Sequence, residues 1–180
     1  MATSLLRRYS DVYLTHPYRT SFVTCLLKGA AADGLAQMYI ERKEHLSVRR
    51  NALFAAWSAA YCGCAQHYIF NIAFSRAFGT ATSASVALQK AAADSFIATP
   101  LLGIPIYYAC KPMIEGTGLS PVAGLREYAA GFAEFYFKPA MVWIPAHLLT
   151  FSVIPPTMRI AWTATVSVGW LSFVSLTSHS

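Results

Sequence analysis

Five ionisable side chains lie inside otherwise apolar stretches of the chain and are its first candidates for chemistry. Lys28 and Asp33 flank a cluster of glycine and alanine residues. Lys90 and Asp94 lie four residues apart around three alanines, and His67 lies in a long stretch without Asp, Glu, Lys or Arg. Ionisable groups in apolar surroundings relay protons, bind ions or pair with one another. Two hypotheses stay open: these residues line a polar path through a helical bundle, or they form buried ion pairs that hold its helices in register.

The sequence lacks the usual constellations of catalytic and metal-binding residues. It contains no serine elbow, no glycine-rich phosphate loop and no pair of histidines at helical spacing. His67 and His147 are far apart in sequence and would share a metal only if the fold brought them together. We therefore predict a protein that is not an enzyme and that holds no metal and no cofactor. The four cysteines lie within apolar runs and are expected to be packing residues: Cys25, Cys62, Cys64 and Cys110.

The composition places these residues in a membrane. Apolar residues make up 56% of the 180-residue chain and charged residues 12%, whereas soluble domains hold about 25% charged residues. The mean hydropathy is +0.42. Residues 139–158 and 160–175 contain no Asp, Glu, Lys or Arg, and an apolar helix of about 20 residues crosses a bilayer. The sequence thus predicts an all-α integral membrane bundle of about four transmembrane helices.

The elements that must position the candidate residues follow from the same pattern. We expect residues 1–15 to form an interfacial amphipathic segment and residues 16–180 to form a membrane-embedded helical domain. Pro100 and Pro105 are expected to kink one of its helices. Apolar stretches between polar or small-residue connections predict helices at 17–39, 51–75 and 85–110, a broken helical segment around 125–144, and a terminal pair at 139–158 and 160–175.

A proline corner divides the terminal pair of helices. Pro155 and Pro156 cannot both lie in an uninterrupted helix, because proline lacks the backbone N–H and restricts the residue before it. Arg159 then falls in the first turn of the next helix, where the helix dipole disfavours a cation. We expect its side chain to reach a membrane interface. An anionic lipid headgroup, water or a carboxylate such as Glu134 would compensate its charge.

The remaining charges predict lipid rather than nucleic acid as a partner. The 14 basic residues give a formal net charge of +6 but are dispersed at the ends of the apolar stretches. Nucleic-acid-binding proteins gather such residues in a dense patch. We expect the basic residues to contact anionic lipid such as cardiolipin. The small residues around the intramembrane lysines and aspartates, Gly34 among them, predict close helix–helix contacts.

An ordered set of residues also resembles the signature of a known family. Phe151, Pro155 and Arg159 follow one another at four-residue spacing, and Trp170 follows them. With the matches upstream, the chain over about residues 9–175 resembles the Mpv-seventeen / peroxisomal membrane protein family of small integral membrane proteins. The residues that carry this resemblance as structural signature positions are His16, Pro17, Gln37, Pro100, Trp143, His147, Phe151, Pro155, Arg159 and Trp170.

The resemblance implies a four-helix protein of the mitochondrial inner membrane or the peroxisomal membrane, with no established enzyme activity and a proposed solute-conducting role. His147 and Thr150 stand where the family has amides, so polar groups of a conducting surface are partly lost. We therefore predict an accessory or structural subunit of a larger mitochondrial inner-membrane assembly, respiratory or ATP-synthase, with other membrane subunits as partners. The alternative is a pore or small-solute pathway of the family type that acts on its own.

Overall fold

The structure is a computed structural model that describes residues 2–177. The side chains of residues 2, 3, 133–139 and 170–177 lie outside the described part, so neither the signature residue Trp170 nor the carboxylate of Glu134 is placed. All regular secondary structure in the described residues is helical. The predicted all-α class is therefore confirmed.

Helical runs in the first two thirds of the chain combine α-helical and π-helical segments. After α1 (Ala2–Thr15), the first run joins α2 (Pro17–Leu35) to η1 (Ala36–Ile40). The second run joins α3 (Val48–Ser58), η2 (Ala59–Ala65), α4 (Gln66–Tyr68), η3 (Ile69–Ala73) and α5 (Phe74–Phe78). The third run joins α6 (Ala84–Ala93), η4 (Asp94–Gly103) and α7 (Ile104–Glu115). The chain then forms α8 (Pro121–Ala130), α9 (Phe132–Ser152) and α10 (Arg159–Thr177).

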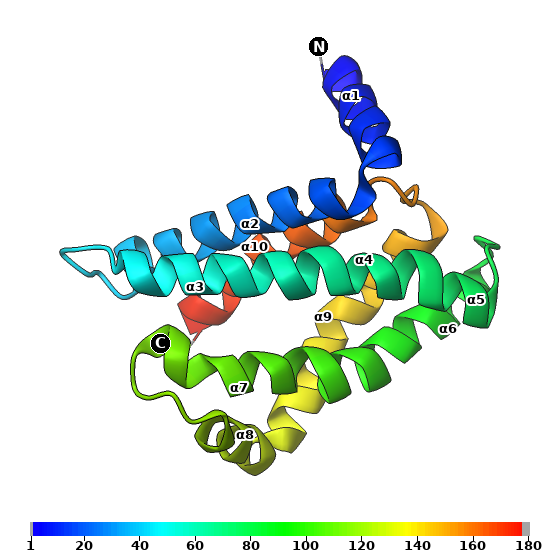
Figure 1. Cartoon of the computed structure of the whole chain (residues 1–180). Coiled ribbons are helices and arrows are strands. Elements are labelled where there is room, and N and C mark those ends of the chain that lie inside the picture. The colour runs from blue at the N-terminus through cyan, green and yellow to red at the C-terminus, as the bar shows by residue number, and fades with distance from the viewer. Residues whose placement is uncertain (1, 178–180) are drawn as a thin grey trace.

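The runs stack as an elongated bundle around one hydrophobic core. The first and second runs lie side by side as a helical hairpin, and the third run returns beneath the second (Figure 1). α9 packs against α6 and η4, and α10 packs against α2 and α9. α1 rises at a steep angle from the N-terminal end of α2 (Figure 1). Where these elements meet, the buried core comprises Cys25, Phe70, Phe74, Ala87, Ala98, Phe151 and Ile160.

The predicted breaks in the C-terminal third are confirmed. α9 ends at Ser152 and α10 begins at Arg159, so the proline pair lies in the corner between two helices. The predicted broken segment around residues 125–144 is divided at Gly131, between α8 and α9. α9 begins earlier than predicted, at Phe132, because Pro139 does not end the helix.

Two prolines in the third run are accommodated by a change of helical period. Pro100 lies in η4, where the Ile104 N–H bonds the carbonyl five residues back, at Thr99. In this register the missing N–H of Pro105 would have bonded the Pro100 carbonyl. The Tyr128 hydroxyl, from α8, donates to that carbonyl instead at 2.7 Å. The proline defect is therefore repaired by a neighbouring helix, as helix breaks in apolar surroundings require.

A glycine sets the spacing of the first helical hairpin. A Cβ atom at Gly29 of α2 would lie 2.7 Å from the Cβ of Ser58 and 3.0 Å from the Cα of Ala55 in α3. The Ser58 hydroxyl donates to the Cys25 carbonyl at 2.8 Å beside this contact. A Cβ at Gly34 would find its nearest neighbours at 3.7 Å, an ordinary contact. The close contact predicted from the small residues therefore falls at Gly29 rather than at Gly34.

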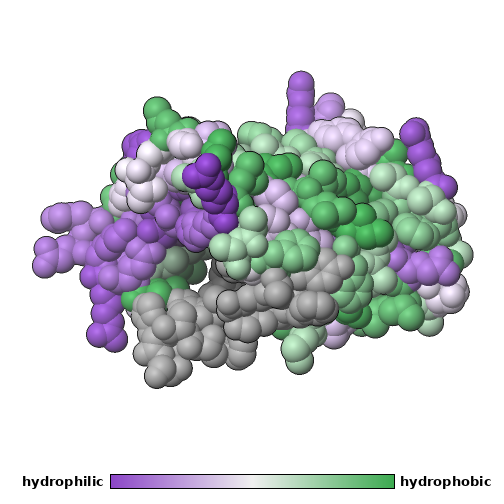
Figure 2. All heavy atoms as spheres, turned by 90° about the horizontal axis from the view of Figure 1, so that it is seen from below, coloured by the Kyte–Doolittle hydropathy of each residue, from purple (hydrophilic) through white to green (hydrophobic). Residues whose placement is uncertain are grey.

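Apolar side chains also cover much of the outer surface. Figure 2 shows hydrophobic residues across the middle of one face and a gathering of hydrophilic residues at one end. Leu27, Ile97 and Leu101 are among the large apolar side chains that are more than half exposed. Within residues 2–177, no helix combines the length and apolar character that a membrane crossing needs.

The glycine contact predicts a difference between two substitutions in one helix. Gly29→Ala should lower the stability of the protein by about 1–3 kcal/mol, because a methyl group there forces two backbones apart. Gly34→Ala is the control, and helix propensity should make it neutral or stabilising by up to about 1 kcal/mol. Thermal unfolding midpoints in a mild detergent compare the two. Equal midpoints for both variants would refute the close contact.

Candidate functional site

A cavity in the middle of the bundle is the candidate site. It has a volume of roughly 310 Å³ and lies between α2, the α3–η2 segment, the η4–α7 segment, α9 and α10. We call it the central cavity and define it by the lining residues on which its chemistry depends: Lys28, Trp57, Asp94, Tyr107, Trp143, His147 and Ser167. Aromatic side chains from three of these elements make much of its wall. Two of the five ionisable residues singled out in the sequence, Lys28 and Asp94, reach it.

A buried acid–imidazole pair forms one wall of the central cavity. Nε2 of His147 lies 2.9 Å from Oδ2 of Asp94, and the Thr99 hydroxyl donates to the same oxygen at 3.0 Å. Asp94 is 2% and His147 1% exposed. Because an ionised carboxylate only accepts hydrogen bonds, the His147 Nε2 atom carries the hydrogen. The imidazole stacks on Trp143, with ring centroids 5.3 Å apart, which fixes the orientation of the ring.

Lys90 is buried but does not pair with Asp94. Its ammonium donates to the Gly79 carbonyl at 2.7 Å and lies 6.0 Å from the centre of the Phe151 ring. Side chains on a helix lean toward its N-terminus, so Lys90 reaches back to the turn that precedes α6. Asp94 begins the π-helical segment and faces α9 instead. The intrahelical pair expected from the four-residue spacing is therefore not formed.

Lys28 and Asp33 do not pair with each other either. Lys28 is half-buried, and no ion pair within the described residues engages its ammonium. The buried Asp33 carboxylate binds residues at the far end of the hairpin: Arg50 Nε at 2.9 Å, Gln37 Nε2 at 2.6 Å and Asn51 Nδ2 at 3.2 Å. Lys28 and Asp33 are five positions apart, which places the two on different faces of α2. The sequence pattern does not single out Arg50 or Asn51, because both lie where a polar connection meets the next predicted helix.

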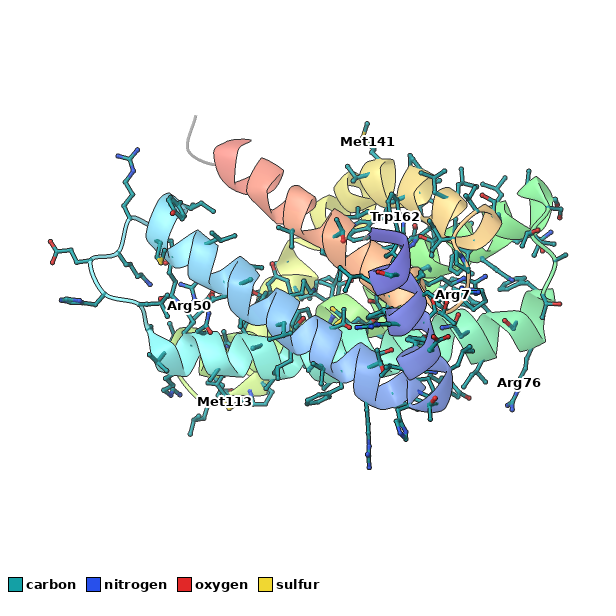
Figure 3. The ribbon with its side chains drawn as sticks, turned by 90° about the horizontal axis from the view of Figure 1, so that it is seen from above. Arg7, Arg50, Arg76, Met113, Met141 and Trp162 are labelled. Carbon is teal, nitrogen blue, oxygen red and sulfur yellow. The ribbon has the colours of Figure 1, made fainter. Side chains whose placement is uncertain are left out.

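The Asp33 cluster closes the loop between the first two runs. Arg50 extends to Glu41 with two bonds of 2.6 and 2.8 Å. Gln37, the signature amide, accepts the Ser47 N–H at 2.7 Å through its carbonyl oxygen. Figure 3 shows Arg50 at the end of the molecule that carries this loop. This cluster is a structural clamp at the end of the bundle, and none of its members lines the central cavity.

The hydrogen bonds from Arg50 lower the pKa of Glu41 to about 2. The ordinary value for the carboxyl is 4.5, so the folded protein holds the carboxylate more strongly than the unfolded chain does. The clamp therefore adds stability above about pH 4.5 that is lost as the pH falls toward 2. The pair is largely solvated, so its contribution should be about 1 kcal/mol or less.

Removing this carboxylate should change the acid sensitivity of the protein. Glu41→Gln should lower the unfolding midpoint at pH 7, and its difference from the wild type should shrink as the pH falls from 4.5 toward 2. Glu44→Gln, in the same loop, is the matched control, because no ion pair within the described residues involves Glu44. A Glu41→Gln difference that stays constant between pH 7 and pH 2.5 would contradict the assignment.

Arg159 is buried inside the bundle rather than directed to an interface. It is 4% exposed. Its Nε donates to the Thr150 carbonyl at 3.2 Å, and Nη1 donates to the Phe70 carbonyl at 3.3 Å and the Asn71 amide oxygen at 3.0 Å. The predicted reach to a membrane interface is therefore wrong. Carbonyl groups in the last turn of α9 and in η3 take the place of lipid or water, and the Phe151 ring lies 5.4 Å from Cζ.

His67 belongs to the same cluster as Arg159 and does not line the central cavity. Its Nδ1 atom bonds the Tyr13 hydroxyl. Asn71 donates to that hydroxyl at 3.0 Å. Because Asn71 also accepts a bond from Arg159, the cluster ties α1 to α10. Sequence patterns did not indicate this connection, because they predict an interfacial amphipathic segment for residues 1–15 as a whole. Tyr13 is in fact buried.

Other signature residues lie at helix ends and turns. Pro17 lies in the first turn of α2, and the His16 carbonyl accepts the Thr20 N–H at 2.9 Å. The Pro155 carbonyl accepts the Met158 N–H at 2.9 Å, which closes the corner before α10. No group of three or more His, Cys, Asp or Glu residues that could hold a metal ion occurs among the described residues.

The buried guanidinium predicts a large stability effect. Arg159→Ala should destabilise the protein by about 2–4 kcal/mol, because three acceptors on two segments lose their donor. Arg76→Ala is the control, since Arg76 is exposed at the opposite end of the second run from Arg50 (Figure 3). Unfolding midpoints and the yield of folded protein in detergent measure both. An Arg159→Ala protein as stable as Arg76→Ala would show that the three bonds contribute little.

Comparisons with known proteins converge on one family. The Mpv17 / PMP22 family profile matches residues 115–175. The chain is 25% identical over 160 residues to Protein SYM1 of Mycosarcoma maydis, which covers 86% of this chain and 77% of that protein. It is 22% identical over 181 residues to Protein SYM1 of Debaryomyces hansenii, over 96% of this chain and 87% of that protein. It is 22% identical over 173 residues to Protein sym-1 of Neurospora crassa, over 95% of this chain and 97% of that protein. No solved structure matches the chain.

Proposed function

Because the chain belongs to the Mpv17 / PMP22 family, we propose that it is a non-enzymatic membrane protein whose central cavity forms part of a pathway for small solutes. The observation that carries the proposal is the buried Asp94–His147 pair in the wall of a roughly 310 Å³ cavity between the helices. An ionisable group held within an apolar bundle is a candidate functional group by default. The Asp33 and Arg159 clusters, by contrast, are bonded to partners within the chain.

Several features support a bilayer as the surroundings of this bundle. Charged residues make up only 12% of the chain, and large apolar side chains such as Leu27, Ile97 and Leu101 are exposed on its outer surface. Contiguous apolar surface of this kind favours contact with lipid or with another protein. We propose the mitochondrial inner membrane as the location, with the peroxisomal membrane as the alternative. The basic residues at the ends of the helices would contact anionic lipid such as cardiolipin.

Filling the cavity tests the pathway directly. The full chain is reconstituted in cardiolipin-containing liposomes, and solute entry is followed by light scattering for uncharged and charged solutes of increasing size. Ser167→Phe, which puts a ring into the central cavity, should lower the rate of entry at least tenfold. Thr165→Phe is the control: it lies on the same helix, bonds the preceding turn in the same way and is exposed. Equal rates for both variants, or no entry above that of empty liposomes, would refute the pathway.

A second candidate is the role of accessory subunit in a respiratory or ATP-synthase assembly. The specific observation in its favour is a groove of roughly 420 Å³ on the side of the bundle, lined by apolar residues of the second run and α7 that include Leu53, Ala60, Ile106 and Met113. Such a groove fits a helix of another membrane subunit. Gentle detergent extraction followed by native electrophoresis separates the two candidates. Co-migration with a large assembly supports the subunit role, and migration as a small oligomer contradicts it.

A further inference from the structure

We propose that the central cavity binds a small organic acid that carries a hydroxyl group and an apolar or aromatic body. This inference rests on the proposed solute pathway and names the chemical class of its solute. It starts from residues of the cavity lining that have a buried polar atom without a partner among the described atoms. Within an interior of low dielectric constant, unpaired polar atoms of this kind are costly unless a ligand or water bonds them.

Trp57 contributes a hydrogen-bond donor. Its indole Nε1 is buried and has no hydrogen-bond partner among the described atoms. The ring is held between Phe54, Tyr61 and Tyr107, with centroid distances of 5.6, 6.1 and 5.0 Å. An indole N–H can only donate, so the group that satisfies it must be an acceptor, such as a carboxylate oxygen.

His147 contributes an atom that a hydroxyl group fits. Its Nε2 is engaged by Asp94, and its buried Nδ1 has no partner among the described atoms. In a neutral ring with hydrogen on Nε2, Nδ1 accepts a hydrogen bond; in a protonated ring it donates one. A hydroxyl group both donates and accepts, so it satisfies Nδ1 in either state. An unsubstituted hydrocarbon chain would leave this atom unpaired.

Among the described lining residues the charges of one lysine and one aspartate balance, and the lysine is the one without a partner. Lys28 is the only lysine or arginine among the lining residues and has no ion-pair partner in the described structure. Asp94 is the only acid in the lining, and one of its oxygens already accepts bonds from His147 and Thr99. The ammonium of Lys28 is thus the charge available to a ligand. A carboxylate would interact with it and with the Trp57 N–H.

The size of the cavity and its apolar lining indicate the size and the apolar body of the ligand. A cavity of roughly 310 Å³ lies at the lower end of the range for small-molecule sites. The aromatic side chains that line it offer flat surfaces against which an apolar or aromatic body can pack. The combination describes a hydroxy acid with a compact apolar group, for which mandelate is a suitable probe.

Binding of three matched compounds tests the inference. Isothermal titration calorimetry on the purified full chain in detergent compares mandelate, phenylacetate, which lacks the hydroxyl, and mandelamide, which lacks the charge. Mandelate should bind about fivefold or more tightly than phenylacetate and about tenfold or more tightly than mandelamide, as the loss of one buried hydrogen bond or one charge contact implies. Equal binding of mandelate and mandelamide, or tighter binding of mandelamide, would overturn the assignment.

Two variants with matched controls locate the site. Lys28→Met should abolish the preference for mandelate over mandelamide, whereas Lys43→Met, which removes a lysine from the loop between α2 and α3, should keep it. Trp57→Phe should weaken mandelate binding about tenfold. Trp162→Phe should leave it unchanged, because the Trp162 indole bonds the Ala146 carbonyl outside the cavity lining (Figure 3). Loss of binding in both control variants would place the site elsewhere.

The outcome for the ligand is separable from the outcome for the pathway. Liposomes that admit small solutes while the protein shows no preference among the three compounds would refute the ligand class and leave the pathway standing. Selective binding of mandelate by a protein that admits no solute would refute the pathway and support a closed binding site. Both measurements use the same purified chain, so a folding defect is recognised from the unfolding midpoint of each variant.

Discussion

The fold depends on the satisfaction of charges that are removed from water. Arg159 shows the constraint most clearly, because its guanidinium is 4% exposed and finds three acceptors on two segments: the Thr150 carbonyl of α9, and the Phe70 carbonyl and Asn71 amide oxygen of η3. A buried cation without such partners would be strongly destabilising. The guanidinium therefore fixes how α9 and α10 sit against the second run. Asp33 does the same for the first helical hairpin, through Arg50 and the polar residues around it.

Changes from α-helical to π-helical period determine where the buried ionisable side chains point. The π-helical segments η2, η3 and η4 alter which face of each run points inward, and π-helical turns are frequent at functional sites. η4 begins at Asp94 and contains Pro100, so the same segment turns the carboxylate toward His147 and accommodates a missing donor. Tyr128 then supplies a bond to the carbonyl of Pro100. The candidate site and the helix repair are thus combined within ten residues.

The central cavity differs from the Asp33 and Arg159 clusters in what it leaves unpaired. Those two clusters bond their ionic groups to carbonyls, amides and opposite charges within the chain. In the cavity, the Trp57 N–H, one nitrogen of His147 and the Lys28 ammonium have no such partner among the described atoms. This contrast favours a solute pathway over a purely structural role for the middle of the bundle, and it gives the proposed ligand its hydroxyl and its carboxylate.

The sequence by itself determined the helical class, the approximate limits of the helices and the proline corner before Arg159, because hydrophobic periodicity and the missing proline N–H act within a few residues. It also found Lys28, Asp94 and His147, since polar groups are conspicuous in apolar runs. Only the tertiary structure decided their partners. Each bond depends on which face of a helix meets which neighbour, and a single π-helical turn or the backward lean of a lysine changes that face. The pairs expected within one helix were therefore replaced by contacts between distant segments.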